Sequence, residues 1–289
     1  MLDHVRLRSF AEVAERKTVV AAAVALGYTP PAVSQHLAKL EAELGVALFD
    51  RAGGRLVLTS AGRKLLPIAL EMIDLGDRAK SCVTQPSSRP RFVIAGFASA
   101  ISTVVVPRLA EIRESMDLEI VEAEDAEAIR DLTLGSVDVV LMQEYDQSAI
   151  ERNPRFEYVP IIRDELKLVL PSGQSSSIGI SDLADAPWLL NGSATRCAEA
   201  TQELLAAHGI QPNVQGTISD NTTLLNLVSA GHGATIVPSS VLDDHHDVVV
   251  SNERIGVHRT ILGVVRTAVA ADVKPLLDLL LQDRSDTKR

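Results

Sequence analysis

One segment, from Thr29 to Leu37, constrains the fold more than any other. Thr29 can cap a helix through its side chain, and Pro30 suits the first helical turn, where a missing N–H costs nothing. Apolar residues then recur at the spacing of one buried helix face, at Val33, Leu37, Leu40 and Leu44. The opposite face carries Pro31, Ser34, Gln35, Ala38 and Lys39. A helix with such short or amide side chains outward can enter a major groove and contact base edges.

Two helices are expected before this segment. An apolar stripe marks the first, at Leu7, Phe10, Val13 and Ala14. Thr18 can cap a second helix, Val19 to Leu26, and Gly27-Tyr28 supplies a tight turn. Helix, short turn and helix is the arrangement that inserts the second helix of the pair into DNA.

Two short strands around a turn are expected after it. Leu48 to Arg51 and Arg55 to Leu58 flank Gly53-Gly54, which predicts a wing. An alternative is a helical bundle with an incidental Gly-rich turn. With the wing, the residues expected to contact DNA are Thr29, Pro30, Pro31, Ser34, Gln35, Lys39, Arg51 and Arg55, the two arginines facing phosphates.

The pattern of these segments resembles the LysR-type transcriptional regulator family. The matching motifs are Leu7-x-x-Phe10, Ala22-Ala23-x-x-Leu26, Ala32-Val33-Ser34, Leu40-Glu41-x-x-Leu44-Gly45, Leu48-Phe49-x-Arg51 and Leu58-Thr59-x-Ala61-Gly62. Thr29-Pro30 and Thr18-Val19 depart from the family's usual Ser-Gln and Ser-Phe or Ser-Leu pairs. The first departure removes a Gln that often contacts a base, so the resemblance leaves the operator sequence open.

Composition fits a cytoplasmic protein of two or three domains. The 289 residues are 46% hydrophobic, and neither a transmembrane helix nor a signal peptide is expected. Cys82 and Cys197 are far apart in the sequence, which fits a protein of the reducing cytosol. Peroxide-sensing cysteine pairs occur in the family, but neither cysteine here lies in a Cys-rich loop, so we expect no such pair.

The net charge of −10 is divided unevenly along the chain. Residues 1–66 carry nine Lys/Arg and six Asp/Glu, a balance of +3, whereas the rest carries 19 and 32, a balance of −13. The excess positive charge therefore lies in the expected DNA-binding part, and the acidic remainder should not bind nucleic acid.

A long helix is expected from Ala61 to about Val83. Its apolar residues form a wide stripe: Leu65, Leu66, Ala69, Met72, Ile73, Leu75 and Ala79. Two copies packed antiparallel would build a dimer, which the family resemblance favours, and the alternative is packing on its own domain. The polar, Pro-rich stretch 84–90 is expected to be a hinge.

Strands and helices alternate through the C-terminal two-thirds. The order predicts parallel strands with crossover helices in two lobes, with ligand bound in the cleft between them. This region also resembles the family's effector-binding domain, built like a periplasmic binding protein. The landmarks are Val105-Val106-Pro107, Leu134-Gly135-x-Val137-Asp138, Gly209-Ile210-x-Pro212 and Ala230-Gly231-x-Gly233-Ala234-x-x-Val237-Pro238. The resemblance implies crossings between lobes near Val159–Arg163 and near Val264–Thr267.

The expected fold is α/β with an N-terminal all-α winged helix-turn-helix, a linker helix and a two-lobed effector domain. The expected boundaries are 1–60 for the DNA-binding domain, 61–90 for the dimerisation helix and hinge, and 91–289 for the effector domain. Within the latter, lobe I spans 91–161 and 266–289, and lobe II spans 162–265.

The effector site is expected where strands end and helices begin. Ser99–Thr103 in one lobe and Asn191–Thr195 in the other offer hydroxyls and backbone N–H groups to a small carboxylate or amino acid. The candidate residues are Ser99, Ala100, Ser102, Glu124, Gln143, Asn191, Ser193 and Thr195. Helix capping alone could explain each hydroxyl. If Glu124 or Asp125 points inward, the effector also carries an amine; otherwise both acids are solvated loop residues.

An enzyme is not expected. The run Asp243–Asp247 is contiguous, so its side chains alternate in direction and suit a solvated loop better than a metal site. No nucleophile elbow or phosphate-binding loop occurs, and neither cofactor nor metal is expected. The expected partners are an operator DNA duplex, a small-molecule effector and a second copy of the chain, with no membrane. A cytosolic solute-binding protein without a DNA role is the alternative.

Overall fold

The computed structural model describes residues 2–52, 55–84, 89–192, 196–242 and 247–281. They form two compact units, Met1–Val93 with Ala126–Asp138, and Ile94–Asp125 with Val139–Arg289. Within the described ranges, no helix combines the length and the apolar character that a membrane span requires. The predicted hinge at 84–90 lies largely outside these ranges, as do Ser193, Thr195 and Asp243–His246.

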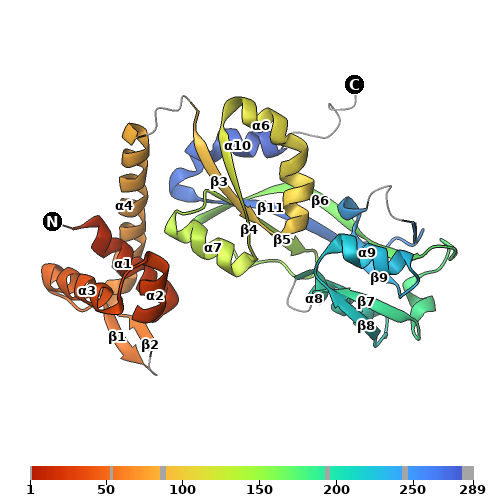
Figure 1. Ribbon diagram of the computed structural model, residues 1–289. Helices are drawn as coiled ribbons and strands as arrows, with labels where there is room; N and C mark the ends of the chain where they lie inside the picture. Colours follow the sequence, from red (N-terminus) through yellow and green to blue (C-terminus); the bar gives the residue numbers. More distant parts are fainter. Residues whose placement is uncertain (1, 53–54, 85–88, 193–195, 243–246, 282–289) are drawn as a thin grey trace. The chain divides into compact units, whose positions relative to one another are not determined.

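The N-terminal elements are a winged helix-turn-helix, as predicted (Figure 1). They are α1 (His4–Arg16), α2 (Val19–Leu26), α3 (Pro30–Leu44), β1 (Phe49–Ala52), β2 (Arg55–Leu58) and α4 (Ser60–Thr84). Each of the first three helices starts at a side-chain cap, at Asp3, Thr18 and Thr29. Each ends at a residue with left-handed backbone, at Lys17, Gly27 and Gly45. Local sequence therefore fixes where these helices begin and end.

Helix α4 has two apolar faces rather than one. Ala69 and Ile73 are buried in the core that contains Phe10 and Leu40. Ile68, Met72 and Leu75 remain 53%, 38% and 65% exposed. The predicted stripe thus divides between the helix-turn-helix core and an outer face. Leu44, predicted on the buried face of α3, is instead 37% exposed, because α3 ends there at Gly45.

The second unit is built on a mixed sheet. Its strands are β3 (Arg91–Gly96), β4 (Asp117–Glu122), β5 (Val139–Tyr145), β6 (Phe156–Pro171), β9 (Thr235–Pro238), β10 (Val248–Val250) and β11 (His258–Arg266). The order is β10-β6-β11-β5-β3-β4, with β9 also pairing with β6. Strands β3 and β5 are parallel, as predicted, whereas β11 runs antiparallel to both β5 and β6. A separate parallel pair joins β7 (Pro187–Asn191) and β8 (Asn213–Ile218).

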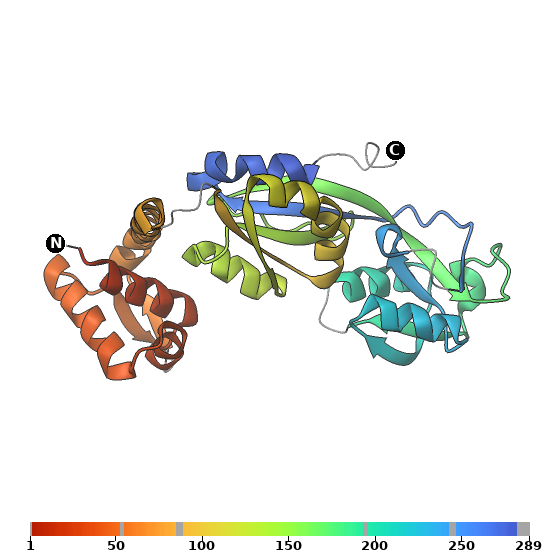
Figure 2. The ribbon, with the colours of Figure 1, turned by 45° about the horizontal axis from the view of Figure 1, so that its top comes forward.

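Helices connect and cover these strands. They are α5 (Ala98–Ala100), α6 (Leu109–Ser115), α8 (Arg196–Ala207), α9 (Asn221–Ser229) and α10 (Ala270–Leu281). Helix α7 (Asp125–Leu134) follows β4 in the chain, and all but its first residue is assigned to the first unit. A π-helical turn, Ile101–Val105, and a 3₁₀ turn, Val106–Arg108, separate α5 from α6 where an interruption at Pro107 was predicted. Helices α6 and α10 lie side by side over one face of the sheet (Figures 1 and 2).

The chain crosses twice between the lobes of this unit. Strand β6 pairs with β11 over Phe156–Glu165 and with β9 and β10 over Leu166–Pro171, so it runs from lobe I into lobe II (Figure 2). Strand β11 pairs with β5 over Arg259–Val264. The return crossing therefore lies before His258, and the expectation near Val264–Thr267 was wrong. The chain cannot cross at Val264–Thr267, because β11 pairs with β6 from His258 to Arg266 and with β5 from Arg259 to Val264.

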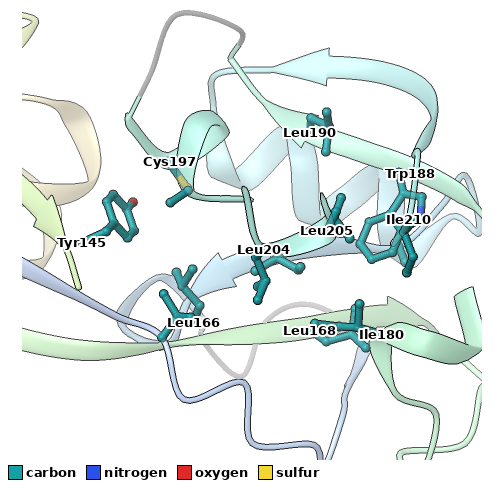
Figure 3. Packing of buried hydrophobic residues seen from close by; sticks show 14 of the residues in the cluster. Tyr145, Leu166, Leu168, Ile180, Trp188, Leu190, Cys197, Leu204, Leu205 and Ile210 are labelled. Atoms are coloured by element: carbon teal, nitrogen blue, oxygen red, sulfur yellow. The ribbon is translucent and has the colours of Figure 1, made fainter. Parts of the chain in front are cut away.

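Lobe II has its own hydrophobic core. Trp188 is fully buried, and its indole N–H donates to the Leu183 carbonyl oxygen at 3.2 Å. Leu204, Leu205 and Ile210 from α8 and the loop after it pack beside Trp188 (Figure 3). Leu168 on β6 completes this contact, so the core attaches lobe II to the strand that arrives from lobe I.

Gly62 allows the wing to close onto α4. A Cβ at this position would collide with the Leu48 carbonyl oxygen and would lie 2.8 Å from Leu58 Cδ2. We expect Gly62→Ala to lower the free energy of unfolding of the DNA-binding unit by about 1–3 kcal/mol, the usual cost of overpacking. Urea unfolding followed by circular dichroism measures this. Ser60→Ala, an exposed change on the same turn, is the control. Equal midpoints for the two variants would contradict the explanation.

Candidate functional site

The recognition helix α3 presents the face that the sequence predicted. Val33, Leu37 and Leu40 are buried, and Thr29 Oγ1 accepts a hydrogen bond from the Ala32 N–H at 3.4 Å. All the residues predicted to contact DNA are exposed: Thr29, Pro30, Pro31, Ser34, Gln35, Lys39, Arg51 and Arg55. Exposure leaves these side chains available to DNA, and contact with DNA remains a prediction.

The wing is fixed to the helices by two groups that the sequence reasoning did not assign. Glu41 Oε1 on α3 accepts hydrogen bonds from the N–H groups of Leu48, at 2.7 Å, and Phe49, at 3.3 Å. The Leu56 N–H donates to the Lys17 carbonyl oxygen at 2.9 Å. Arg51 and Arg55 therefore stand on a hairpin that is anchored at both of its strands.

A cleft of about 620 Å³ lies between the two lobes of the second unit. Five predicted residues line it: Ser99, Ser102, Glu124, Gln143 and Asn191. Ala100 does not line the cleft, because its side chain is fully buried. The cleft also contains residues that were not predicted, among them Glu122, Asp220, Asn221, Ser240 and Arg259.

The predicted polar residues already have local hydrogen bonds. The Ser99 carbonyl oxygen accepts from the hydroxyls of Ser102, at 3.1 Å, and Thr103, at 2.6 Å. Asn191 Nδ2 donates to Asn221 Oδ1 at 3.1 Å. The cap position of α5 is Phe97, and it makes no side-chain bond, so helix capping does not account for Ser99. Helix α5 is also only three residues long, which weakens the expected dipole contribution to anion binding.

One cleft residue, Arg259, belongs to a buried ion pair. Arg259 on β11 is 2% exposed, and its Nε and Nη2 donate to the two Asp164 carboxylate oxygens at 3.2 and 3.0 Å. Arg259 Nη1 also donates to Ser99 Oγ of lobe I at 3.2 Å, and Nη2 to Ser240 Oγ of lobe II at 2.8 Å. One guanidinium therefore contacts both lobes and the strand that joins them. Neither Arg259 nor Asp164 belongs to a local motif, so no sequence signal indicated the pair.

A second ion pair lies at the helix starts of the two lobes. Arg196 Nε and Asp125 Oδ2 are 3.4 Å apart. Burial raises the pKa of Asp125 to about 6, with Glu124 adding to the rise and Arg196 opposing it. Asp125 is therefore not the solvated loop residue of the alternative expectation, whereas Glu124 is exposed.

Cys197 lies at the edge of the cleft against the core of lobe II. Its side chain is 6% exposed, and the Tyr145 hydroxyl is directed at it (Figure 3). Burial raises the pKa of the Cys197 thiol, although the Tyr145 hydroxyl and the Arg259 charge oppose the rise. The thiol form, which is a poor nucleophile, therefore predominates at neutral pH.

Comparison with known proteins identifies both parts of the chain. Residues 4–63 match the bacterial regulatory helix-turn-helix family of LysR type, and residues 86–283 match the LysR substrate binding domain. The chain belongs to the LysR family of transcriptional regulators, with a DNA-binding helix-turn-helix and an effector-binding domain.

Relatives of known description cover most of the chain. The transcriptional regulator ShiR of Corynebacterium glutamicum is 31% identical over 80% of each chain. A probable hydrogen peroxide-inducible genes activator of Mycobacterium avium is 28% identical over 86% of this chain and 81% of its own. The structure of full-length OxyR from Pseudomonas aeruginosa superposes with a TM-score of 0.63, at 18% identity, over 97% of this chain and 94% of the other. The last comparison supports the fold alone.

The raised pKa of Asp125 predicts a pH-dependent stability. The folded state holds the Asp125 proton more tightly than the unfolded state, so stability falls as pH rises from about 4 to about 6. We expect Asp125→Asn to stabilise the protein by roughly 1–3 kcal/mol at about pH 8, where the wild-type residue is ionised, and to have no effect at about pH 4. Urea unfolding at both pH values tests this. A gain that is the same at both would show that Asp125 titration is not its source.

Proposed function

We propose that this regulator binds an operator in the cytoplasm through α3 and the wing, and that a small molecule in the inter-lobe cleft controls the binding. The observation that supports this most strongly is the recognition helix, capped at Thr29, buried on one face and exposed on the other. The solute-binding alternative does not account for residues 4–63, which match a DNA-binding family. We retain the expected domains, 1–60, 61–90 and 91–289, with lobe II now ending before His258.

We propose that two copies associate through the outer face of α4. Ile68, Met72, Leu75 and Ala79 follow one another at helical spacing on that face, and all are exposed in the single chain. Removing this stripe from water favours a homodimer, and pairs of dimers would give a tetramer. A dimer places two recognition helices on two half-sites related by its symmetry.

The effector acts by shifting an equilibrium between two arrangements of the lobes. A ligand can do so only through different affinities for the two arrangements. The cleft is suited to this because Ser99 and Ser240, on different lobes, bind the same guanidinium. A ligand that alters this contact changes how the lobes are held, and the dimer carries the change to the recognition helices. The predicted polar anchors are Ser99, Ser102, Asn191, Ser193 and Thr195.

Two exposed residues of the DNA-binding unit should have different effects on operator binding. We expect Gln35→Ala to cost about 1–3 kcal/mol and to relax specificity at one base pair, because an amide side chain contacts base edges. Arg51→Ala should weaken binding to all sequences alike and lower the salt slope by about 1, because it contacts a phosphate. Fluorescence anisotropy with operator and scrambled duplexes at several salt concentrations distinguishes the two. Unchanged affinity and slope in both variants would refute the assigned face.

Relatives described as peroxide-inducible gene activators raise the question of a thiol switch. We propose that peroxide does not act on this protein through Cys197, because its thiol is buried and its pKa is raised. We expect peroxide treatment to leave the operator affinity of the wild type unchanged, and likewise that of Cys197→Ser. Operator affinity is measured before and after treatment of each protein. A peroxide response that Cys197→Ser abolishes would overturn this proposal.

A further inference from the structure

The charge of the cleft is negative despite the arginine on its floor. The positive charge of Arg259 is balanced by the Asp164 carboxylate, to which it donates two hydrogen bonds, so the buried pair carries no net charge. Glu122 and Glu124 also line the cleft, at the end of β4, and both are exposed. Neither forms an ion pair with any residue that the structure describes. Asp220 adds a third lining carboxylate, although it caps α9 by accepting from Thr223.

The floor of the same cleft offers hydrogen-bond donors. Gln143 is 8% exposed and its Oε1 accepts from the Tyr145 hydroxyl at 3.2 Å, which directs its Nε2 away from Tyr145. Among the described residues, Gln143 Nε2 has no acceptor. A guanidinium has five N–H groups, and one on Arg259 Nη1 is likewise left without a described acceptor. Both residues line the cleft, so a ligand there can supply an acceptor to each of these N–H groups.

Donors at the floor and carboxylates at the mouth select for a ligand with two different ends. Building on the proposed effector control, we propose that the effector is a zwitterion, an amino acid or a close analogue. Its carboxylate accepts from Gln143 Nε2 and Arg259 Nη1, and its ammonium group lies beside Glu122 and Glu124. A ligand with a carboxylate but no amine would be repelled by the negative charges of Glu122 and Glu124, and it would therefore bind more weakly.

A metal ion is a weaker explanation for the acids at the mouth. Across the described ranges, no three His, Cys, Asp or Glu side chains gather closely enough to hold a metal. Two exposed carboxylates fall short of the six or more oxygen ligands that calcium takes. An ammonium group, in contrast, is satisfied by two carboxylates and water.

The test is calorimetric titration of the full-length protein with matched ligand pairs. Each L-amino acid is paired with the carboxylic acid that has the same side chain but lacks the amine, for example L-leucine with 4-methylpentanoate. We expect at least one amino acid to bind, and its amine-free partner to bind at least about tenfold more weakly. Equal binding of the two partners would overturn the zwitterion and leave effector control in the cleft intact.

Variants locate the two ends of the ligand. Glu122→Gln with Glu124→Gln should weaken the amino acid at least about tenfold and leave its amine-free partner unchanged or tighter. Glu151→Gln, the same change at an exposed site outside the cleft, should alter neither. Gln143→Leu should weaken both partners, because both carry the carboxylate. Amino-acid binding that is unaffected by the double variant would overturn the proposal.

Failure of the proposed function gives a different result. If none of the amino acids or amine-free acids of the panel binds the cleft, while the protein still binds operator DNA, then effector control by such ligands through this cleft is refuted together with the zwitterion. Operator binding that changes with an amino acid supports effector control, and it supports the zwitterion only if the amine-free partner at the same concentration leaves operator binding unchanged.

Discussion

The Arg259–Asp164 ion pair is the interaction on which the effector domain depends. Both groups are almost completely buried, on the adjacent strands β6 and β11, and they make two hydrogen bonds to each other. Removing one partner would leave an uncompensated buried charge, at a cost of about 3–5 kcal/mol. Because Ser99 and Ser240 bind the same guanidinium, the pair also fixes where each lobe meets the cleft. The stability of the effector domain and the geometry of its cleft therefore both depend on Arg259.

The DNA-binding unit depends on short-range features instead, which explains why the sequence predicted it well. Caps at Thr18 and Thr29, the apolar spacing of α3 and left-handed glycines all act within a few residues. The parallel pairing of β3 and β5 joins more distant segments, but it was predicted from the alternating order of strands and helices. The lobe crossing was misplaced because strand pairing between distant segments decides it, and no local pattern records that β11 lies between β5 and β6.

The cleft could be predicted only in part, for the same reason. Strand ends and polar junctions located Ser99, Gln143 and Asn191, all of which line it. Arg259 and Asp164 lie 95 residues apart and meet only in the folded chain. Without them, the sequence left open a small carboxylate or an amino acid as the effector. The neutral Arg259–Asp164 pair, with Glu122 and Glu124 lining the same cleft, favours the amino acid of these two.

We propose that the protein binds DNA at a specific sequence and that a small zwitterion changes this binding. Selection of duplexes from a random DNA pool by the purified protein, with and without a mixture of L-amino acids, tests both parts at once. We expect an enriched inverted repeat, with half-sites about one helical turn or a multiple apart, whose enrichment changes when the amino acids are present. No enriched sequence under either condition would contradict it.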